Sequence, residues 1–123
     1  MKYQELYDMV MKEGFVVVQV SGNVIPQSGY GIVVLDLNNL DYRWMTFPVL
    51  DTEAFDTGVK RLTHNLPDGA DHIIVETIGD WIYLEGMVVF KDRQYAMGYA
   101  HGSGQHSILD IANRKNIERK SKK

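Results

Sequence analysis

The chain has 123 residues, no cysteine and a formal net charge of -3, with 45% hydrophobic and 24% charged residues. This length suits one domain that buries a core without disulfides, and the lack of cysteine excludes a disulfide framework, a thiolate metal site and a cysteine nucleophile. No segment approaches the roughly 18 consecutive apolar residues of a membrane helix, so we expect a soluble protein that does not associate with membranes. Residues 1–6 lack the basic-then-apolar layout of a secretory signal, which makes a cytoplasmic location the expectation.

The charge is distributed unevenly along the chain. Residues 1–112 carry 15 acidic and 7 basic side chains, whereas residues 113–123 carry 1 acidic and 6 basic ones, so a body of -8 precedes an end of +5. A basic end is typical of a helix terminus whose cations complement the helix dipole, and it is also a possible contact for nucleic acid. Because the acidic body repels phosphate, we expect no nucleic-acid binding except through this basic tail.

The chain begins with a predicted helix and two predicted strands. The helix spans residues 3–13, and Gly14 supplies its left-handed stop. β-branched runs then predict strands over residues 15–20 and 30–35, with a turn-rich stretch between them. The apolar stripe of the helix consists of Tyr3, Leu6, Tyr7 and Val10.

A third strand and a second helix follow. Apolar and polar residues alternate over residues 42–47, and Pro48 ends this strand. Asp51 or Thr52 can accept the free amides that start the helix, and residues 67–69 form its exit turn. The buried stripe of this helix is predicted to be Phe55, Val59, Leu62 and Leu66.

The second half of the chain aligns with the first. Gly79–Asp80 and Gly22–Asn23 occupy equivalent turns, where residues that tolerate positive φ are needed between strands. Matched turns, together with a helix after each triplet of strands, predict an internal duplication. The aligned segments are residues 74–82 with 17–25, 86–90 with 31–35, and 95–97 with 42–44.

The last predicted elements are a strand over residues 95–101 and a helix over residues 105–120. The predicted fold is therefore α+β, in the order α-βββ-α-βββ-α, with two βββα repeats and the helices on one face of the sheet. The sheet is mostly antiparallel, because the links between strands are too short for parallel crossovers. We expect a single domain over residues 1–113, followed by a basic helix end or tail over residues 114–123.

The most distinctive local stretch covers residues 100–107, where a strand end, a glycine-bracketed turn and a helix start are expected. Exposed amides at a helix N-terminus can hold a phosphate or carboxylate, although this turn matches neither the Walker pattern nor the dinucleotide fingerprint. A flexible strand-to-helix connection is the alternative. The predicted ligand-binding residues are His101, Gly102, Ser103, Gly104, His106, Arg93 and Tyr99.

Metal binding and catalysis receive little support. His106 and Asp110 stand four residues apart and would share a helix face, but four histidines in one chain produce such a spacing often. Ser103 lacks a Gly-x-Ser-x-Gly elbow. Glu76 and Glu85 fall on neighbouring strands, and whether they approach each other depends on a register that the sequence leaves open. We therefore predict no metal, no cofactor and no catalytic residue.

Aromatic side chains suggest an interface. Along residues 95–101, large side chains alternate with the small residues Ala96, Gly98 and Ala100. Small residues let a helix lie close, so the aromatic side would meet something else, unless the aromatic side is itself the covered core. The predicted interface residues are Tyr42, Trp44, Trp81, Tyr83, Tyr95 and Met97.

These features predict a small, non-catalytic, homo-oligomeric binding protein that sequesters or inhibits a protein partner or a phosphorylated small ligand. Within this class, a phage or mobile-element counter-defence inhibitor suits a compact, cysteine-free chain without a catalytic signature. The alternative is an enzyme that acts on a phosphate ester or nucleotide. It would use His101 or His106 as acid or base and the Gly102–Gly104 turn as its anion site.

Overall fold

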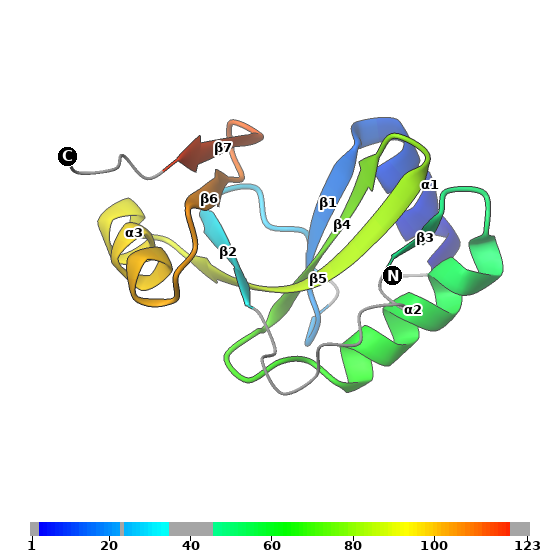
Figure 1. Cartoon of the computed structure of the whole chain (residues 1–123), viewed down its shortest axis with the longest axis horizontal. Coiled ribbons are helices and arrows are strands. Elements are labelled where there is room, and N and C mark those ends of the chain that lie inside the picture. The colour runs from blue at the N-terminus through cyan, green and yellow to red at the C-terminus, as the bar shows by residue number, and fades with distance from the viewer. Residues whose placement is uncertain (1–2, 23, 35–45, 119–123) are drawn as a thin grey trace.

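The computed structural model describes residues 3–22, 24–34 and 46–118, which form three helices and one curled antiparallel sheet of seven strands (Figure 1). The predicted α+β class is confirmed. The sheet order is β1-β4-β5-β2-β6-β7, with β3 paired to β5. The elements are α1 (Tyr3–Glu13), β1 (Phe15–Gln19), β2 (Tyr30–Val34), β3 (Thr46–Pro48), α2 (Thr52–His64), β4 (His72–Ile78), β5 (Trp81–Phe90), α3 (Arg93–Gly102), β6 (Ser107–Asp110) and β7 (Lys115–Glu118).

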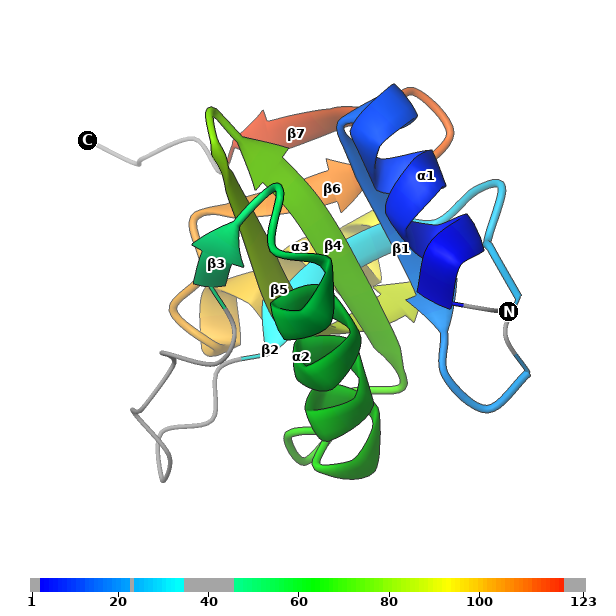
Figure 2. The same ribbon diagram turned by 90° about the vertical axis from the view of Figure 1, so that its right-hand side faces the viewer.

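Helix α1 begins and ends where the sequence predicts, whereas α2 begins there but ends at His64, before Leu66 of its predicted stripe. Gly14 adopts a φ of 87° and donates its amide to the Val10 carbonyl at 2.9 Å, which closes α1. The Asp51 carboxylate accepts the amide of Ala54 at 3.0 Å and caps the start of α2. In Figure 2 both helices lie in front of β1, β4 and β5.

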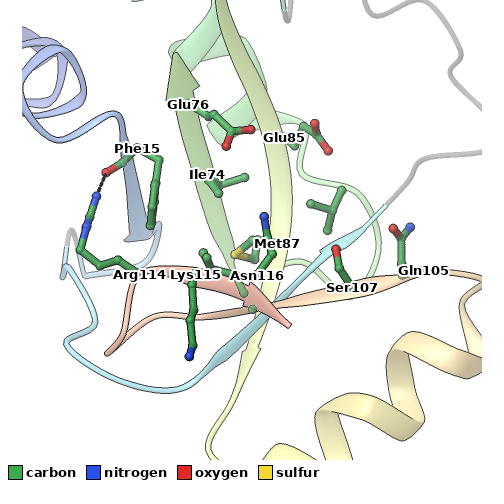
Figure 3. Close-up of a pocket in the computed structure, with 13 residues that line it drawn as sticks. Phe15, Ile74, Glu76, Glu85, Met87, Gln105, Ser107, Arg114, Lys115 and Asn116 are labelled. Carbon is green, nitrogen blue, oxygen red and sulfur yellow. Dashed lines mark hydrogen bonds between the residues drawn. The ribbon is translucent and has the colours of Figure 1, made fainter. Parts of the chain in front are cut away.

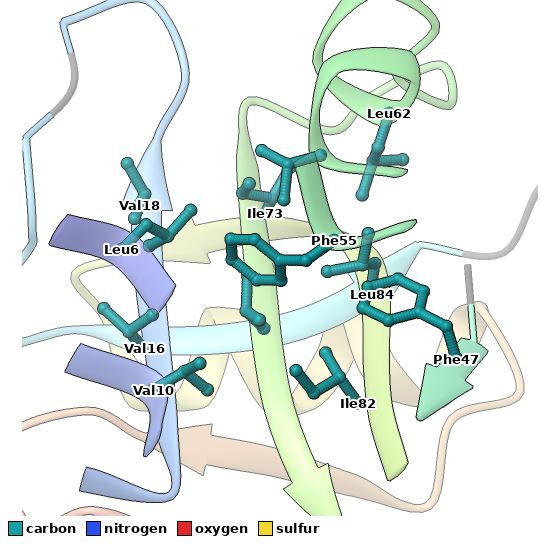
Figure 4. Packing of buried hydrophobic residues seen from close by; sticks show 12 residues of the cluster. Leu6, Val10, Val16, Val18, Phe47, Phe55, Leu62, Ile73, Ile82 and Leu84 are labelled. Atoms are coloured by element: carbon teal, nitrogen blue, oxygen red, sulfur yellow. The ribbon is translucent and has the colours of Figure 1, made fainter. Parts of the chain in front are cut away.

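The main core lies between these two helices and the sheet. Phe55 of α2 is fully buried at its centre, with its ring 5.4 Å from that of Tyr7 and 6.1 Å from that of Phe47 (Figure 4). Both contacts are edge-to-face, which is a favoured aromatic geometry. The buried cluster comprises Leu6, Val10, Val16, Val18, Phe47, Phe55, Val59, Leu62, Ile73, Val75, Ile82 and Leu84.

The strand register assigns the side chains of the sheet to two faces. Val75 of β4 lies opposite Val16 of β1 and Leu84 of β5, and all three pack beneath α1 and α2. Val88 stands on the same face of β5 as Leu84, because side chains alternate along a strand, and it belongs to the cluster beneath α3. All three helices therefore lie on one face of the sheet, although the third of them, α3, is not the helix that the sequence predicted. This face is the outside of the curl, so α3 sits at the opposite end of the molecule from α1 and α2 (Figure 1).

The prediction of a strand over residues 95–101 is wrong, because these residues belong to helix α3. Ala96 and Ala100 are four residues apart and fully buried, so the small residues form the helix's own contact stripe and bring it close to the sheet. The Asp92 carboxylate accepts the amide of Tyr95 at 2.8 Å and caps the helix. Large and small residues alternate here as in a strand, but the spacing that corresponds to burial is the four-residue spacing of Ala96 and Ala100 in a helix.

The prediction of a helix over residues 105–120 is also wrong, because β6 and β7 form a hairpin there. The Asp110 carboxylate accepts the side-chain amide of Asn113 at 2.8 Å and its backbone amide at 3.3 Å, which favours a turn over a continued helix. The side-chain hydrogen bond from Asn113 holds the pKa of Asp110 below its ordinary value. Of the expected basic tail, residues 115–118 form β7, and residues 119–123 lie outside the described residues.

The predicted element order therefore fails after Phe90, and the internal duplication is not confirmed. β4 and β5 form a hairpin through Gly79–Asp80, whereas β1 and β2 are separated in the sheet by β4 and β5. Of the predicted third strand, Thr46 and Phe47 lie in β3, and residues 42–45 are outside the described part. No helix among the described residues is long and apolar enough to cross a bilayer.

Candidate ligand-binding site

The helix-free concave face of the sheet contains a cavity of about 230 Å³ (Figure 3). Six strands and the segments that join them enclose it, so residues far apart in the sequence meet there. Its floor is apolar and its walls are polar or charged. The apolar lining consists of Phe15, Val33, Ile74, Met87 and Leu109, and the polar lining includes Glu76, Glu85, Gln105, Ser107 and Asn116.

A glycine keeps this cavity open. Gly31 of β2 lies against the thioether of Met87, and a Cβ atom at position 31 would clash with that side chain. Met87 can therefore lie over Gly31, whereas a larger residue at position 31 would displace the Met87 side chain. Met87 is fully buried in this position.

Two glutamates share the concave face. Glu76 of β4 lies opposite Tyr83 of β5, and Glu85 lies two residues further along β5, opposite Ile74. The register therefore makes Glu76 and Glu85 diagonal neighbours on one face, at a typical separation of roughly 7–8 Å between Cα atoms. Figure 3 shows both carboxylates at the same end of the cavity, away from Arg114 and Lys115. The register thus answers the question that the sequence left open.

The surroundings of the two carboxylates destabilise their ionised forms. Burial raises the pKa of Glu76 above its ordinary value. Burial also raises the pKa of Glu85, and repulsion from Glu76 raises it further. Among the described residues, neither carboxylate accepts a hydrogen bond or forms an ion pair. Within residues 3–22, 24–34 and 46–118, the pair therefore has no ion-pair partner.

Arg114, one of the two cations that line the cavity, is already engaged with the backbone. The Arg114 guanidinium donates to the carbonyl oxygens of Glu13 and Phe15 at 3.1 and 3.0 Å, and it lies 3.9 Å over the Phe15 ring. It therefore joins the β6–β7 turn to the corner between α1 and β1. Lys115 and Asn116 continue the same wall of the cavity.

The basis for an anion site at Gly102–Gly104 is wrong. Helix α3 ends at Gly102, so this turn follows a helix C-terminus, where carbonyl groups rather than amides are left over. Ser103 caps this end by donating its hydroxyl and amide to the Tyr99 carbonyl at 2.8 and 3.0 Å. Ligand binding by these residues stays a prediction, without support from helix-terminal amides.

The other predicted ligand-binding residues are spread over the length of α3. Arg93 begins this helix and His101 lies in its last turn, and ten residues of helix span about 15 Å. Tyr99 packs against the Phe90 ring at 5.1 Å, and His106 is exposed outside the cavity lining. These residues therefore do not converge on one point, although Gln105 and Ser107 on either side of His106 line the cavity.

The predicted interface residues divide between two places. Trp81 and Tyr83 lie on the concave face of β5, where Trp81 is 47% exposed at the hairpin tip. Tyr95 packs its ring 4.9 Å from that of Phe90, while Met97 contacts the cluster beneath α3. Tyr42 and Trp44 lie outside the described residues. Self-association through Trp81 and Tyr83 stays a prediction.

The structure does not support the metal site considered at His106 and Asp110. His106 and Asp110 do not share a helix face, because Ser107–Asp110 form strand β6. Within residues 3–22, 24–34 and 46–118, no group of three or more histidine, aspartate or glutamate side chains could hold a metal ion.

The arrangement is suited to recognition of a small molecule. It offers an apolar floor, a rim of amide and hydroxyl groups, and an end with two carboxylates that have no partner among the described residues. Comparison with family models, curated proteins and solved structures found no match. The chemistry of the cavity is therefore the basis on which a function can be assigned.

Proposed function

We propose that this protein binds a small organic cation, an ammonium group on an apolar body, in the cavity on the concave face of its sheet, without catalysing a reaction. The observation that carries this proposal is the position of Glu76 and Glu85 at one end of the cavity. Both carboxylates are partly buried and neither has a partner among the described residues. A bound ammonium group would supply the missing countercharge and donate charge-assisted hydrogen bonds to both.

The size and lining of the cavity narrow the ligand further. Its volume of about 230 Å³ lies below the range of roughly 300–1,000 Å³ that is typical of drug-sized ligands, which favours a compact molecule. The side chains of Ile74, Met87 and Leu109 favour a hydrocarbon or aromatic body over a sugar. A single ring that bears an aminomethyl group combines the two requirements.

The cavity does not support the phosphorylated ligand predicted from the sequence. Glu76 and Glu85 would repel a phosphate, and Arg114 is committed to backbone carbonyls. The predicted class, a non-catalytic binding protein that sequesters a small ligand, is retained with a ligand of opposite charge. Homo-oligomerisation, inhibition of a protein partner, a viral or mobile-element role and a cytoplasmic location stay predictions.

Titration of the isotope-labelled protein with three probes of one shape tests this proposal. The probes are benzylamine, benzyl alcohol and benzoate, and amide chemical shifts are recorded by NMR at pH 7. Benzylamine is expected to shift the amides of Glu76, Glu85 and Met87. Benzyl alcohol should bind more weakly, and benzoate should cause no shifts there, because the carboxylates repel it.

The matched control is Asp56→Asn, which removes one charge from an exposed position of α2 on the other side of the sheet. It should leave the benzylamine shifts unchanged. Equal binding of the alcohol and the amine would contradict recognition by the carboxylates. Shifts confined to the Gly102–Gly104 turn would favour the anion site instead, and new product signals would identify an enzyme.

A further inference from the structure

The β6–β7 hairpin forms one wall of the cavity but is attached to the sheet along a short line. β6 pairs with β2 through two residue pairs, Tyr30 with Asp110 and Gly31 with Leu109, and the Ile111 amide donates to the Gly29 carbonyl at 3.0 Å. Strand β7 is the last strand in the sheet order and pairs with β6. On the helix side, Ile117 contacts the cluster beneath α3. Strand β7 is thus held by its pairing with β6 along one edge and by the contact of Ile117.

The tip of this hairpin reaches across to the opposite edge of the sheet. The Arg114 guanidinium donates to the Glu13 and Phe15 carbonyls at 3.1 and 3.0 Å and stacks 3.9 Å over the Phe15 ring (Figure 3). β1 and β7 are the two end strands of the sheet order. Among the described residues, these Arg114 contacts supply the side-chain hydrogen bonds between the hairpin and the α1–β1 corner.

The backbone of β1 explains what Arg114 binds. The Gly14 carbonyl accepts the amide of Thr77 in β4 at 2.8 Å. Because neighbouring residues of an antiparallel strand point their backbone groups in opposite directions, the Phe15 carbonyl points away from β4, off the free edge. An unpaired carbonyl on an edge strand needs a donor, and Arg114 provides one.

The backbone of Arg114 is itself unusual. Its φ is 54°, which makes it the one described non-glycine residue with positive φ. Asparagine or glycine would adopt this conformation at lower cost. An arginine that is held in a strained conformation while its side chain makes three contacts is the pattern expected of a residue kept for its side chain.

We infer that Arg114 is a latch, which holds the β6–β7 hairpin closed against the α1–β1 corner and so keeps the wall of the cavity in place. When the guanidinium leaves Phe15, the hairpin turn and β7 can move away from the α1–β1 corner and widen the cavity, while Ile108 and Leu109 keep β6 in the core. The latch is inferred from the Arg114 contacts in the protein without a ligand. Its consequence, that a bound ligand exchanges more slowly, depends in addition on the proposed function.

Distance measurements between two spin labels test the latch without any ligand. The chain has no cysteine, so labels can be placed at two introduced cysteines alone, Lys12→Cys on α1 and Ala112→Cys in the hairpin turn, both exposed positions. With Arg114 present, one narrow distance distribution is expected. Arg114→Asn, which tolerates the positive φ but removes the guanidinium, should give a broader distribution that extends to longer distances.

Lys115→Ser is the matched control, because it removes the neighbouring cation without touching the latch. Amide exchange supplies a second readout: Arg114→Asn should speed exchange in β7 by about tenfold, which corresponds to about 1.4 kcal/mol of closing free energy, and leave β4 protected. An unchanged distribution in Arg114→Asn, or equal broadening in Lys115→Ser, would overturn the latch. If Arg114→Asn also speeds amide exchange in β4, the substitution has destabilised the whole fold. Arg114→Gln then replaces it, and its distance distribution and amide exchange are compared with those of Lys115→Ser in the same way.

Discussion

Replacement of Phe55 with alanine is expected to lower the free energy of unfolding by about 3–5 kcal/mol, the usual cost of deleting a buried aromatic ring. Phe55 is fully buried, and its ring makes edge-to-face contacts with Tyr7 of α1 and Phe47 of β3. The substitution therefore leaves a void where α1, α2 and the sheet meet. Since domains of this size are stable by roughly 5–15 kcal/mol, the variant should be only marginally folded.

Urea unfolding measures this loss as a shift in midpoint at a constant slope. Phe55→Leu, which retains most of the volume, should cost less than about 1.5 kcal/mol. Phe90→Ala should cost less than Phe55→Ala because Phe90 is only partly buried. A loss below about 1 kcal/mol for Phe55→Ala would mean that α2 does not cover this face of the sheet.

The double substitution Glu76→Gln and Glu85→Gln is expected to stabilise the free protein at pH 7 and to weaken benzylamine binding. Burial raises the pKa of both carboxyls in the folded state, and repulsion from Glu76 raises that of Glu85 further. The folded state therefore binds protons more tightly than the unfolded state, and stability falls as pH rises from the ordinary value of 4.5 through the raised pKa values. The double variant lacks these two titrating groups, so its free energy of unfolding should not fall with pH for this reason. Its gain in free energy of unfolding over the wild type should be about 1 kcal/mol or less at pH 7 and vanish below pH 4.

Binding should respond in the opposite direction. Loss of two charge-assisted hydrogen bonds is expected to weaken benzylamine binding by roughly 10–100-fold at pH 7. Wild-type affinity should rise with pH as the two carboxyls ionise, whereas the variant should show no such rise. Calorimetric titration beside thermal unfolding measures both effects, with Asp56→Asn as the control. A variant that is less stable at pH 7, or that keeps its affinity for benzylamine, would contradict the role of the two glutamates.

The first half of the fold was predictable because each helix carries two independent signals. In α1 the stripe that contains Leu6 and Val10 ends at Gly14, and in α2 the stripe around Phe55 begins after Asp51. Periodicity and capping agree at these places, so tertiary contacts had no conflict to resolve.

The part of the chain after Phe90 was mispredicted because its local signals conflict. Residues 95–100 alternate like a strand, yet Asp92 caps a helix in which Ala96 and Ala100 form the buried stripe. The run after Gln105 contains apolar residues at helical spacing, yet the turn made by Asp110 and Asn113 converts it into a hairpin. In both cases one capping side chain outweighed the apolar period.

The candidate site was only partly predictable, because it depends on register and on curvature. Glu76 and Glu85 stand out in the sequence as charges within apolar strands, but a register shifted by one residue would place them on opposite faces. The contribution of Arg114 and Ser107 requires the hairpin to curl over the sheet, which no local pattern encodes. A charged residue in an otherwise apolar strand was the signal that could have directed attention to this face.

The most direct test of the amine site is an NMR titration of the side-chain carboxyl carbons of Glu76 and Glu85, with and without benzylamine. In the free protein both should titrate above the ordinary glutamate value of 4.5, and benzylamine should lower both pKa values because it stabilises the ionised forms. Titration of both carboxyls at the ordinary value, with no response to benzylamine, would contradict the account.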